Sequence, residues 1–328
     1  CHVGRKAYSS MKSDKRRAMK KMDAEASNTY LEFKRTMGTD KRYTSTNMDG
    51  RQYSSEELSA EVLKALKSFI TDEDFKSVVI TVPAKFTVNQ KTATIEAAKL
   101  AGFNHIELLQ EPIAAAMAYG LTASQKDGYW LVFDFGGGTF DAALIKVEDG
   151  IIQVFDTEGD NYLGGKNLDF AIVDNILMPY LQKNYSIEGY LANPKDKEIL
   201  REAMKTYAEE IKNELSFKDS YGLYVDPGDL GEDEDGEEYE IDLTVTKEEV
   251  YDAIRPLSQK AVDICKDLLK RNNLSSNQLG KLILVGGPTH SPLVRQMLKE
   301  QVTPNVDSSM NPMTAVAEGA ALYASTID

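Results

Sequence analysis

Apolar residues follow two different spacings along the chain, and the alternation between them predicts a mixed α/β fold. At 54–70 they recur every three or four positions after a Ser/Glu start, which predicts an amphipathic helix. At 78–82 a β-branched run stops at a proline, which predicts a strand. A helix at 88–101, a strand at 106–109 and a helix at 111–119 follow. This order is typical of an α/β unit with a central sheet.

The alternation restarts after a loop at 121–128, so we expect a second lobe from there. A strand at 129–135 comes first, and strands at 142–148 and 151–157 form a meander that turns at Asp149 and Gly150. Further helices are expected at 170–185, 195–215, 247–272 and 315–325, with a short strand at 281–285.

The segment from 129 to 141 reads YWLVFDFGGGTFD and joins a predicted buried strand to three glycines. Glycines let the backbone turn tightly and approach a ligand, and free amide groups in such a loop can meet an anion. Asp134, at the end of the strand, is a hard oxygen ligand suited to Mg²⁺, directly or through water, while Thr139 and Asp141 add a hydroxyl and a second carboxylate. Taken alone, the same residues fit an ordinary glycine turn in a β-meander equally well.

Length and composition narrow the class of protein. A chain of 328 residues is long for one core, so two lobes with a cleft are expected. Lys and Arg number 38 against 52 Asp and Glu, and the net charge of −14 argues against nucleic acid as the main partner. No apolar run is long enough to span a bilayer, so no membrane is expected. Cys1 and Cys265 show neither disulfide nor zinc spacing, which favours a reducing, cytoplasmic compartment.

Two segments carry unbalanced charge. Residues 4–21 are basic, and a solvated face explains them better than a binding patch. Residues 219–242 hold eleven acidic residues and no Lys or Arg, which predicts an acidic surface hairpin or a mobile loop. A cation site there is disfavoured because no ordered ligand spacing is present.

Six blocks, taken in order, resemble the seventy-kilodalton heat-shock chaperones, the DnaK-like family within the actin and sugar-kinase superfamily. The resemblance covers essentially the whole chain and implies a two-lobed, actin-like ATPase fold with duplicated ribonuclease-H-like sheets and peripheral subdomains. It places lobe I at 1–125 (peripheral subdomain 1–52, core 53–125) and lobe II at 126–328 (core 126–168 and 251–328, peripheral subdomain 169–250). The blocks are VVITVPAKFTVNQKTATIEAAKLAGF, LLQEPIAAAMAYGL, LVFDFGGGTFDAALIKVEDGI, GDNYLGGKNLD, LILVGGPTHSP and NPMTAVAEGAALYA.

The resemblance implies binding of ATP or ADP with Mg²⁺, and it allows K⁺ as a further ion. Asp134 would hold the hydration shell of Mg²⁺, and Lys34, in FKRTMG, would reach the γ-phosphate. Glu111, in QEP, would orient water or metal, although its place at a helix start also has a dipole-based explanation. Thr139 and Asp141 would place the attacking water and a monovalent cation. The backbone around the phosphates would come from Gly136, Gly137, Gly138, Thr139, Gly164 and Gly165.

The nucleoside would meet residues from two later segments. Glu209, Lys212 and Ser216 share one helix face by their spacing, and in the family that face meets ribose and base. Without the resemblance they would be a solvated stripe. The close backbone approach and the stacking side chain would come from Gly286, Gly287 and His290.

The chain also departs from the family pattern. It begins where the family has completed its first β-hairpin, so we expect the first N-terminal hairpin and its phosphate loop to be absent from this chain. Either the native protein supplies that segment, or hydrolysis is impaired. His290 stands where the family commonly has Arg, and weaker or altered nucleotide affinity is expected. Other departures are Asn213, Met313, Lys166 and Lys91, each at a position where the family prefers a different charge or donor.

The favoured function is that of an ATP-binding and ATP-hydrolysing domain whose nucleotide state controls lobe closure and a peptide-binding domain not present here. The resemblance implies a J-domain co-chaperone, a nucleotide-exchange factor and unfolded clients as partners. One alternative is a nucleotide-binding scaffold with impaired hydrolysis, in which the acidic 219–242 segment serves a protein partner. A small-molecule kinase of the same superfamily is disfavoured, because the chain shows no signal for a sugar or acid pocket.

Overall fold

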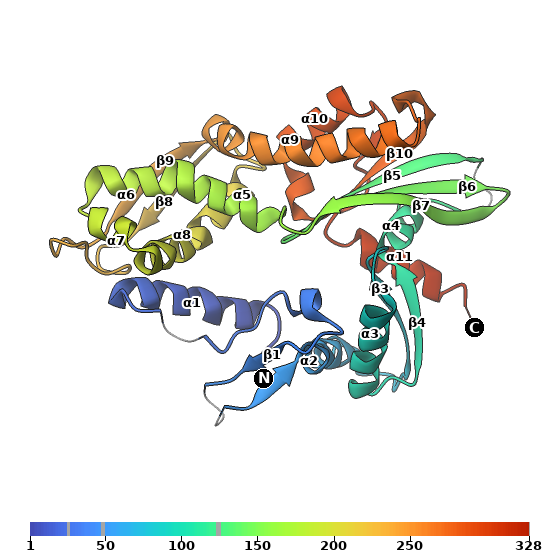
Figure 1. Ribbon diagram of the computed structural model, residues 1–328, viewed down its shortest axis with the longest axis horizontal. Coiled ribbons are helices and arrows are strands. Elements are labelled where there is room, and N and C mark those ends of the chain that lie inside the picture. Colours follow the sequence, from blue (N-terminus) through green and yellow to red (C-terminus); the bar gives the residue numbers. More distant parts are fainter. Residues whose placement is uncertain (25–26, 47–49, 123–125, 328) are drawn as a thin grey trace. The chain divides into compact units, whose positions relative to one another are not determined.

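The computed structural model describes residues 1–24, 27–46, 50–122 and 126–327, which form two compact units (Figure 1). One unit comprises Cys1, Tyr30–Gly164 and Gln259–Asp328, and the other comprises His2–Thr29 and Gly165–Ser258. The end of lobe I expected at 125 and a portion of the loop expected at 121–128 lie outside the described residues. The units are divided at other positions than the expected lobes, so the lobe boundaries remain a prediction.

A five-stranded mixed sheet carries the glycine loop in the first unit. The strand order is β11-β10-β5-β6-β7, in which the last three form the predicted antiparallel meander. Asp149 and Gly150 have φ of 51° and 76°, as a tight two-residue hairpin turn requires. The strands are β5 (Gly128–Phe135), β6 (Phe140–Glu148), β7 (Ile151–Asp160), β10 (Leu279–Val285) and β11 (Val306–Asp307).

The parallel pairing of β5 with β10 brings two glycine segments to one edge of this sheet. Asp134 is the register partner of Val285, so both strands end side by side. The glycines that follow Phe135 and Val285 therefore lie close together. This is the edge at which the sequence predicts the phosphate site.

Helices cover both faces of the sheet. Figure 1 shows α4 (Glu111–Ala118) and α11 (Ala315–Ala324) on one face, with α10 (Pro292–Gln301) on the other. Small residues let α4 and α11 approach, since a Cβ on Gly319 would overlap the carbonyl of Ala114. The strands contribute fully buried aromatic rings, among them Phe133, Phe135 and Phe140.

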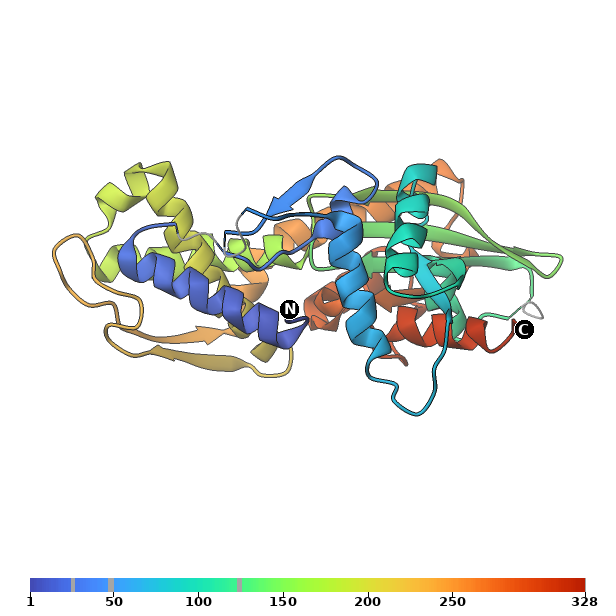
Figure 2. The same cartoon turned by 90° about the horizontal axis from the view of Figure 1, so that it is seen from below.

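A second sheet in the same unit has two strands among the described residues. The strands β3 (Ser77–Val82) and β4 (His105–Gln110) pair in parallel. Their neighbours α2 (Ser55–Lys67) and α3 (Val88–Leu100) lie side by side (Figure 2), and each begins with a capping box. The α/β class is confirmed. Duplicated ribonuclease-H-like sheets remain a prediction, because the two sheets differ in strand number.

The remaining elements of this unit are short. A hairpin of β1 (Arg42–Thr44) and β2 (Gln52–Ser54) follows the 3₁₀ turn η1 (Phe33–Thr36). Two further 3₁₀ turns, η3 (Ser276–Gln278) and η4 (Gly287–His290), flank β10.

The second unit is built around α8 (Pro194–Glu214). The helix predicted at 170–185 is interrupted by a π-helical turn, η2 (Val173–Leu177), between α5 (Gly165–Ile172) and α6 (Met178–Asn184). A short α7 (Glu188–Ala192) precedes α8, and α9 (Lys247–Arg271) begins in this unit and continues into the other. None of the described helices has the length and apolar character needed to cross a membrane.

The basic N-terminal segment forms helix α1 (Arg5–Lys21), which the sequence pattern did not predict. Met11, Ala18 and Met19 are buried, and α1 packs against α8 (Figure 2). Most of its Lys and Arg side chains are exposed, as expected for a solvated face. The prediction was incomplete because the many charges obscure a narrow apolar face.

The acidic segment forms the hairpin expected as one of two alternatives. Its strands are β8 (Ser220–Val225) and β9 (Ile241–Thr246). In the connecting loop, the carboxylate of Asp233 accepts backbone N–H bonds from Ser186 at 2.8 Å and Glu237 at 2.9 Å. Burial would raise the pKa of Asp233, but these bonds outweigh it and lower the pKa. A charged side chain thus organises the loop from inside.

Candidate functional site

The glycine loop between β5 and β6 is a tight turn with one open side. The N–H of Gly136 donates to the carbonyl of Thr139 at 3.0 Å, so this amide is used within the turn and is not free for an anion, contrary to the simplest expectation. Gly137 is exposed, and a Cβ there would meet no heavy atom within 4 Å. The backbone at Gly137 is therefore the section of the loop that faces open space.

The second glycine segment packs directly against the first. Gly286 has φ of 94°, and a Cβ on it would overlap the carbonyl of Phe135. Its N–H donates to the carbonyl of Pro312 at 2.9 Å. Gly287 follows, with its Cβ position 3.1 Å from the sulfur of Met313. Glycine is required at 286 for the ends of β5 and β10 to meet, in addition to any role in nucleotide binding.

Three predicted carboxylates crowd together beside the loop. Burial, and then the negative charges of Glu111 and Asp141, raise the pKa of Asp134 to about 7, against the opposing effect of Lys34. Burial and Glu111 also raise the pKa of Asp141, which a hydrogen bond with Thr139 partly offsets. Such mutual repulsion is typical of sites that take a cation or carry out proton chemistry.

Lys34 approaches this group from η1. Its Nζ lies 2.5 Å from Oε1 of Glu111, 77 residues away in sequence. The Lys34 side chain is 56% exposed, and the Glu111 side chain is 18% exposed. The structure thus brings the two predicted catalytic residues together and leaves the ammonium group accessible.

A small cavity links the carboxylates to the end of β3. Its volume is about 20 Å³, which admits one water molecule. The polar residues of its lining come from α4, β5, β6 and β7 and, in Lys85, from the turn after β3. The lining residues are Pro83, Ala84, Lys85, Glu111, Pro112, Val132, Asp134, Asp141, Ala142, Ala143 and Thr157.

The donor set fits Mg²⁺ bound mainly through water. Within the described residues, no three His, Cys, Asp or Glu side chains form a group that could hold a metal ion. Mg²⁺ usually keeps several waters and takes one or two protein carboxylates. Asp134 and Asp141 are cross-strand partners whose raised pKa values reflect unfavourable negative charge, so a hydrated cation beside them would relieve that repulsion.

Gly164 lies against the glycine loop. A Cβ on Gly164 would overlap the backbone of Gly138, so the missing side chain permits this packing. Gly165 begins α5, and its carbonyl accepts a bond from Nζ of Lys212 at 3.4 Å. Gly164 thus lies at the glycine loop, whereas Gly165 belongs to the second unit and contacts Lys212 there.

The predicted nucleoside residues on α8 have partners within their own unit. The hydroxyl of Tyr8, on α1, donates to the carboxylate of Glu209. Nζ of Lys212 lies 2.5 Å from the carboxylate of Asp169, and the hydroxyl of Ser216 donates to the carbonyl of Lys212 at 3.1 Å. Contact of these residues with a nucleoside remains a prediction.

His290 ends η4, close to the second glycine segment. Burial and the positive charge of Arg295 lower the pKa of His290, so its ring is neutral at neutral pH. Arg295 donates to the carbonyl of Thr289 at 2.7 Å, which fixes that charge near the turn. A neutral ring fits the expectation that His290 can stack but supplies no permanent charge.

Arg35 is a site residue that sequence reasoning missed. Its guanidinium donates to the carbonyl of Gly138, in the glycine loop, and to the carbonyl of Asn161 at 3.1 Å. The only signal for it in the sequence is its position next to Lys34 in FKRTMG.

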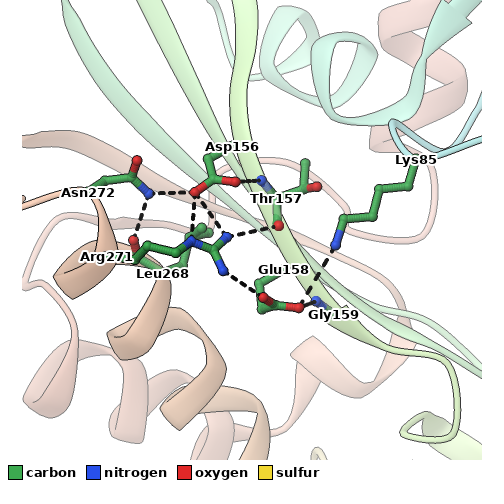
Figure 3. A network of polar contacts seen from close by, with 8 residues as sticks. All are labelled: Lys85, Asp156, Thr157, Glu158, Gly159, Leu268, Arg271 and Asn272. Carbon is green, nitrogen blue, oxygen red and sulfur yellow. Dashed lines mark hydrogen bonds and ion pairs between the residues drawn. The ribbon is translucent and has the colours of Figure 1, made fainter.

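Figure 3 shows a polar network that joins β7 to the C-terminal end of α9. Arg271 lies 2.7 Å from Glu158 and 2.9 Å from Asp156, and Asn272 donates to Asp156 at 2.7 Å. Nζ of Lys85 lies 3.9 Å from the other oxygen of Glu158. Since Lys85 also lines the small cavity, the network connects α9 to the wall of the cavity.

A wider cavity, of about 650 Å³, lies in the second unit. It is bordered by Lys20 and Lys21 at the end of α1 and by acidic residues of the hairpin loop, including Asp229 and Glu232. None of the predicted site residues lines it. We therefore assign the candidate site to the edge of the five-stranded sheet, where the predicted phosphate and metal groups lie.

Comparison with known proteins agrees with this geometry. The family model described as "Hsp70 protein" matches residues 6–327. The chain is 33% identical over 298 residues to the chaperone protein DnaK of Methanothermobacter thermautotrophicus, an alignment that covers 90% of this chain and 48% of DnaK. The chain thus spans about half the length of that relative. It belongs to the Hsp70 family and corresponds to a DnaK-like nucleotide-binding domain.

Proposed function

We propose that this chain binds ATP and ADP with Mg²⁺ and hydrolyses ATP, as the nucleotide-binding domain of a DnaK-like chaperone. The observation that carries the proposal is the 2.5 Å contact of Lys34 with Glu111 beside Asp134 and Asp141, at the edge where two glycine segments meet. Positive charge, hydrated-metal ligands and an open glycine backbone are the groups that phosphoryl transfer requires.

In this proposal each residue has a separate task. Water attacks the γ-phosphorus and the bond to the β–γ bridging oxygen breaks, so that the products are ADP, inorganic phosphate and a proton released to solvent. Lys34 neutralises charge that develops on the γ-phosphoryl oxygens. Glu111, Asp141 and Thr139 orient the attacking water, and Asp134 would hold the hydration shell of Mg²⁺. The ion, when bound, would supply positive charge that offsets the negative charge of the phosphates.

The pairing of Lys34 with Glu111 has a consequence for the resting state. The ammonium group of Lys34 is already neutralised by the carboxylate of Glu111, so an incoming phosphate has to compete with Glu111 for Lys34. Because the Lys34 side chain is largely exposed, this exchange of partners requires little rearrangement.

Calorimetric titration with ATP and ADP, with and without Mg²⁺, tests binding, and a phosphate-release assay tests turnover. We expect Mg²⁺-dependent binding, and we expect Lys34→Ala to reduce turnover at least about a hundredfold. Lys64→Ala is the matched control, since Lys64 forms a surface pair with Glu61 at 2.9 Å. Failure of the unchanged protein to bind either nucleotide would contradict the proposal.

A second candidate is a nucleotide-binding scaffold with impaired hydrolysis. It is supported by the Gly136 amide, which is used inside the turn and is therefore not free to meet a phosphate. In that case both the unchanged protein and Lys34→Ala would bind Mg-ATP and release no phosphate. Measuring binding and turnover on the same samples separates the two candidates.

Properties of a whole chaperone belong to the same proposal. They include lobe closure, control of a peptide-binding domain, a cytoplasmic location, a role for K⁺, and partnership with a J-domain co-chaperone, an exchange factor and unfolded clients. Their support is the family membership of a chain that spans about half of its DnaK relative.

A further inference from the structure

Arg35 joins two backbone turns that meet at the phosphate-loop edge. Its Nη2 donates to the carbonyl of Gly138 in the glycine loop and to the carbonyl of Asn161, in the turn after β7, at 3.1 Å. The other side of the guanidinium lies 3.3 Å from the carboxylate of Glu32. One side chain from η1 thus contacts both turns.

The glycine loop is enclosed between Arg35 and the turn after β7. A Cβ on Gly138 would lie 2.6 Å from Nη2 of Arg35 and 2.6 Å from the carboxylate of Glu32. On another side, the backbone of Gly138 occupies the space where Gly164 would carry a Cβ. The loop therefore has little freedom to shift at Gly138, whereas Gly137 remains open.

We propose that Arg35 is a positioning residue that fixes the orientation of the peptide between Gly138 and Thr139. A peptide group is planar, and its C=O and N–H point in opposite directions. When Arg35 holds the carbonyl of Gly138, the N–H of Thr139 is directed to the other side of the loop. A bound phosphate then meets a donor there and not a carbonyl oxygen, which would repel it.

The same contact couples the loop to Lys34. Lys34 and Arg35 are consecutive in η1, and they reach Glu111 and Gly138, respectively. A displacement of η1 therefore changes the position of the ammonium group and the orientation of the loop peptide together. The role of Arg35 in phosphate binding rests on the proposed function. The hydrogen bond of Arg35 to the glycine loop, which we call the Arg35 latch, is present in the chain without nucleotide.

The contacts explain why arginine suits this position. A guanidinium presents several N–H donors in a fixed plane and can serve two carbonyls and a carboxylate at once. An ammonium group on a lysine of similar reach has no such planar geometry. Arg35→Lys should therefore keep some of the latch, and Arg35→Gln should lose its charge-assisted bonds.

Amide hydrogen exchange without nucleotide tests the latch itself. In Arg35→Gln we expect the segments 136–140 and 160–164 to exchange about tenfold faster, with a smaller increase in Arg35→Lys. Arg42→Gln is the control, because Arg42 donates only to the neighbouring carbonyl of Lys41, at 3.3 Å, among the bonds found in the described residues. Unchanged exchange in both Arg35 variants would overturn the proposal. If Arg35→Gln is too unstable to be measured, unchanged exchange in Arg35→Lys alone would also overturn it.

Titration with ATP and with adenosine tests the positioning role. We expect Arg35→Gln to lose about tenfold in ATP affinity while its affinity for adenosine is unchanged, and Arg35→Lys to recover some of the loss. Equal ATP affinity in all variants would overturn the positioning role. If the unchanged protein binds no ATP, the proposed function fails, and the exchange measurement still decides whether Arg35 holds the loop.

Discussion

The ammonium group of Lys34 lies 2.5 Å from the carboxylate of Glu111, and both belong to the group that surrounds Asp134. Through this contact, Lys34 brings one positive charge to a cluster of three carboxylates. Without Lys34, negative charge at Asp134, Asp141 and Glu111 would be opposed by fewer cations, chiefly Lys85 near Asp141. This relationship gives a direct test of the electrostatics of the site.

Replacing Glu111 by Gln should lower the pKa of Asp134 from its value of about 7 in the metal-free protein. The negative charge of Glu111 is, after burial, the largest cause of that raised pKa. Removing it makes ionisation of Asp134 easier. An NMR titration of the Asp134 carboxyl carbon measures the change, with Glu61→Gln as a surface control. A pKa that stays at about 7 in Glu111→Gln would show that the charge of Glu111 does not contribute, and that burial and Asp141 set the pKa.

Gly319→Ala should destabilise the protein by about 1–3 kcal/mol, although alanine normally favours a helix. The new Cβ would overlap the carbonyl of Ala114 and force α11 away from α4. Gly137→Ala should have little effect on stability, because a Cβ there meets no heavy atom within 4 Å. Urea denaturation of both variants checks this contrast, and equal stability of the two would contradict the packing described.

Arg271→Gln should weaken the network of Figure 3 in a pH-dependent way. The hydrogen bond from Arg271 lowers the pKa of Glu158. Burial would raise the pKa of Asp156, but the bonds from Asn272 and Arg271 outweigh it and lower the pKa. Carboxylates with lowered pKa values stabilise the fold above the unfolded values of about 4, and this contribution is lost as the pH falls through the folded values.

At pH 7 we therefore expect the Tm of Arg271→Gln to fall by about 1–3 °C, a small change because the network is partly exposed. The difference from the unchanged protein should shrink as the pH falls below about 4. Lys266→Gln serves as the control, since Lys266 only approaches Asp263 at 4.0 Å on the same helix. A Tm difference that is constant from pH 7 to pH 3 would exclude an electrostatic origin.

Tyr8→Phe should increase the affinity for ATP a few-fold. The hydroxyl of Tyr8 donates to Glu209, the residue expected to meet the ribose, so the substitution removes a competitor for that carboxylate. Calorimetry with ATP measures the effect, and Tyr221→Phe is the control, because Tyr221 donates to the neighbouring Glu210. Lower affinity in Tyr8→Phe would mean that α1 supports the nucleoside site.

The sequence predicted the elements near the glycine loop well, because each has a strong local signal. The turn at Asp149 and Gly150, the capped start of α2 at Ser54, and the strands on both sides of Gly136 follow from backbone chemistry that acts within a few residues. Family motifs then connected distant residues such as Lys34 and Glu111, and the structure brings these two together.

Other features depend on contacts between distant segments and could not be predicted. The burial of Met11 and Met19 arises from packing of α1 on α8, which no spacing among so many charges reveals. The bond from Arg35 to a carbonyl 103 residues away has no sequence pattern of its own. The backbone hydrogen bonds that Asp233 accepts from Ser186 and Glu237 could not be predicted either, since an acidic residue in an acidic loop is normally solvated.

The position of Gly286 against the carbonyl of Phe135 limits which substitutions this protein can accept during evolution. A side chain at 286 would separate β10 from β5, and a shift of the turn after Phe135 would move both glycine segments. The two segments, about 150 residues apart in the chain, therefore form a single unit of sequence constraint. In a set of homologues we expect substitutions near 136 and near 286 to occur together or not at all.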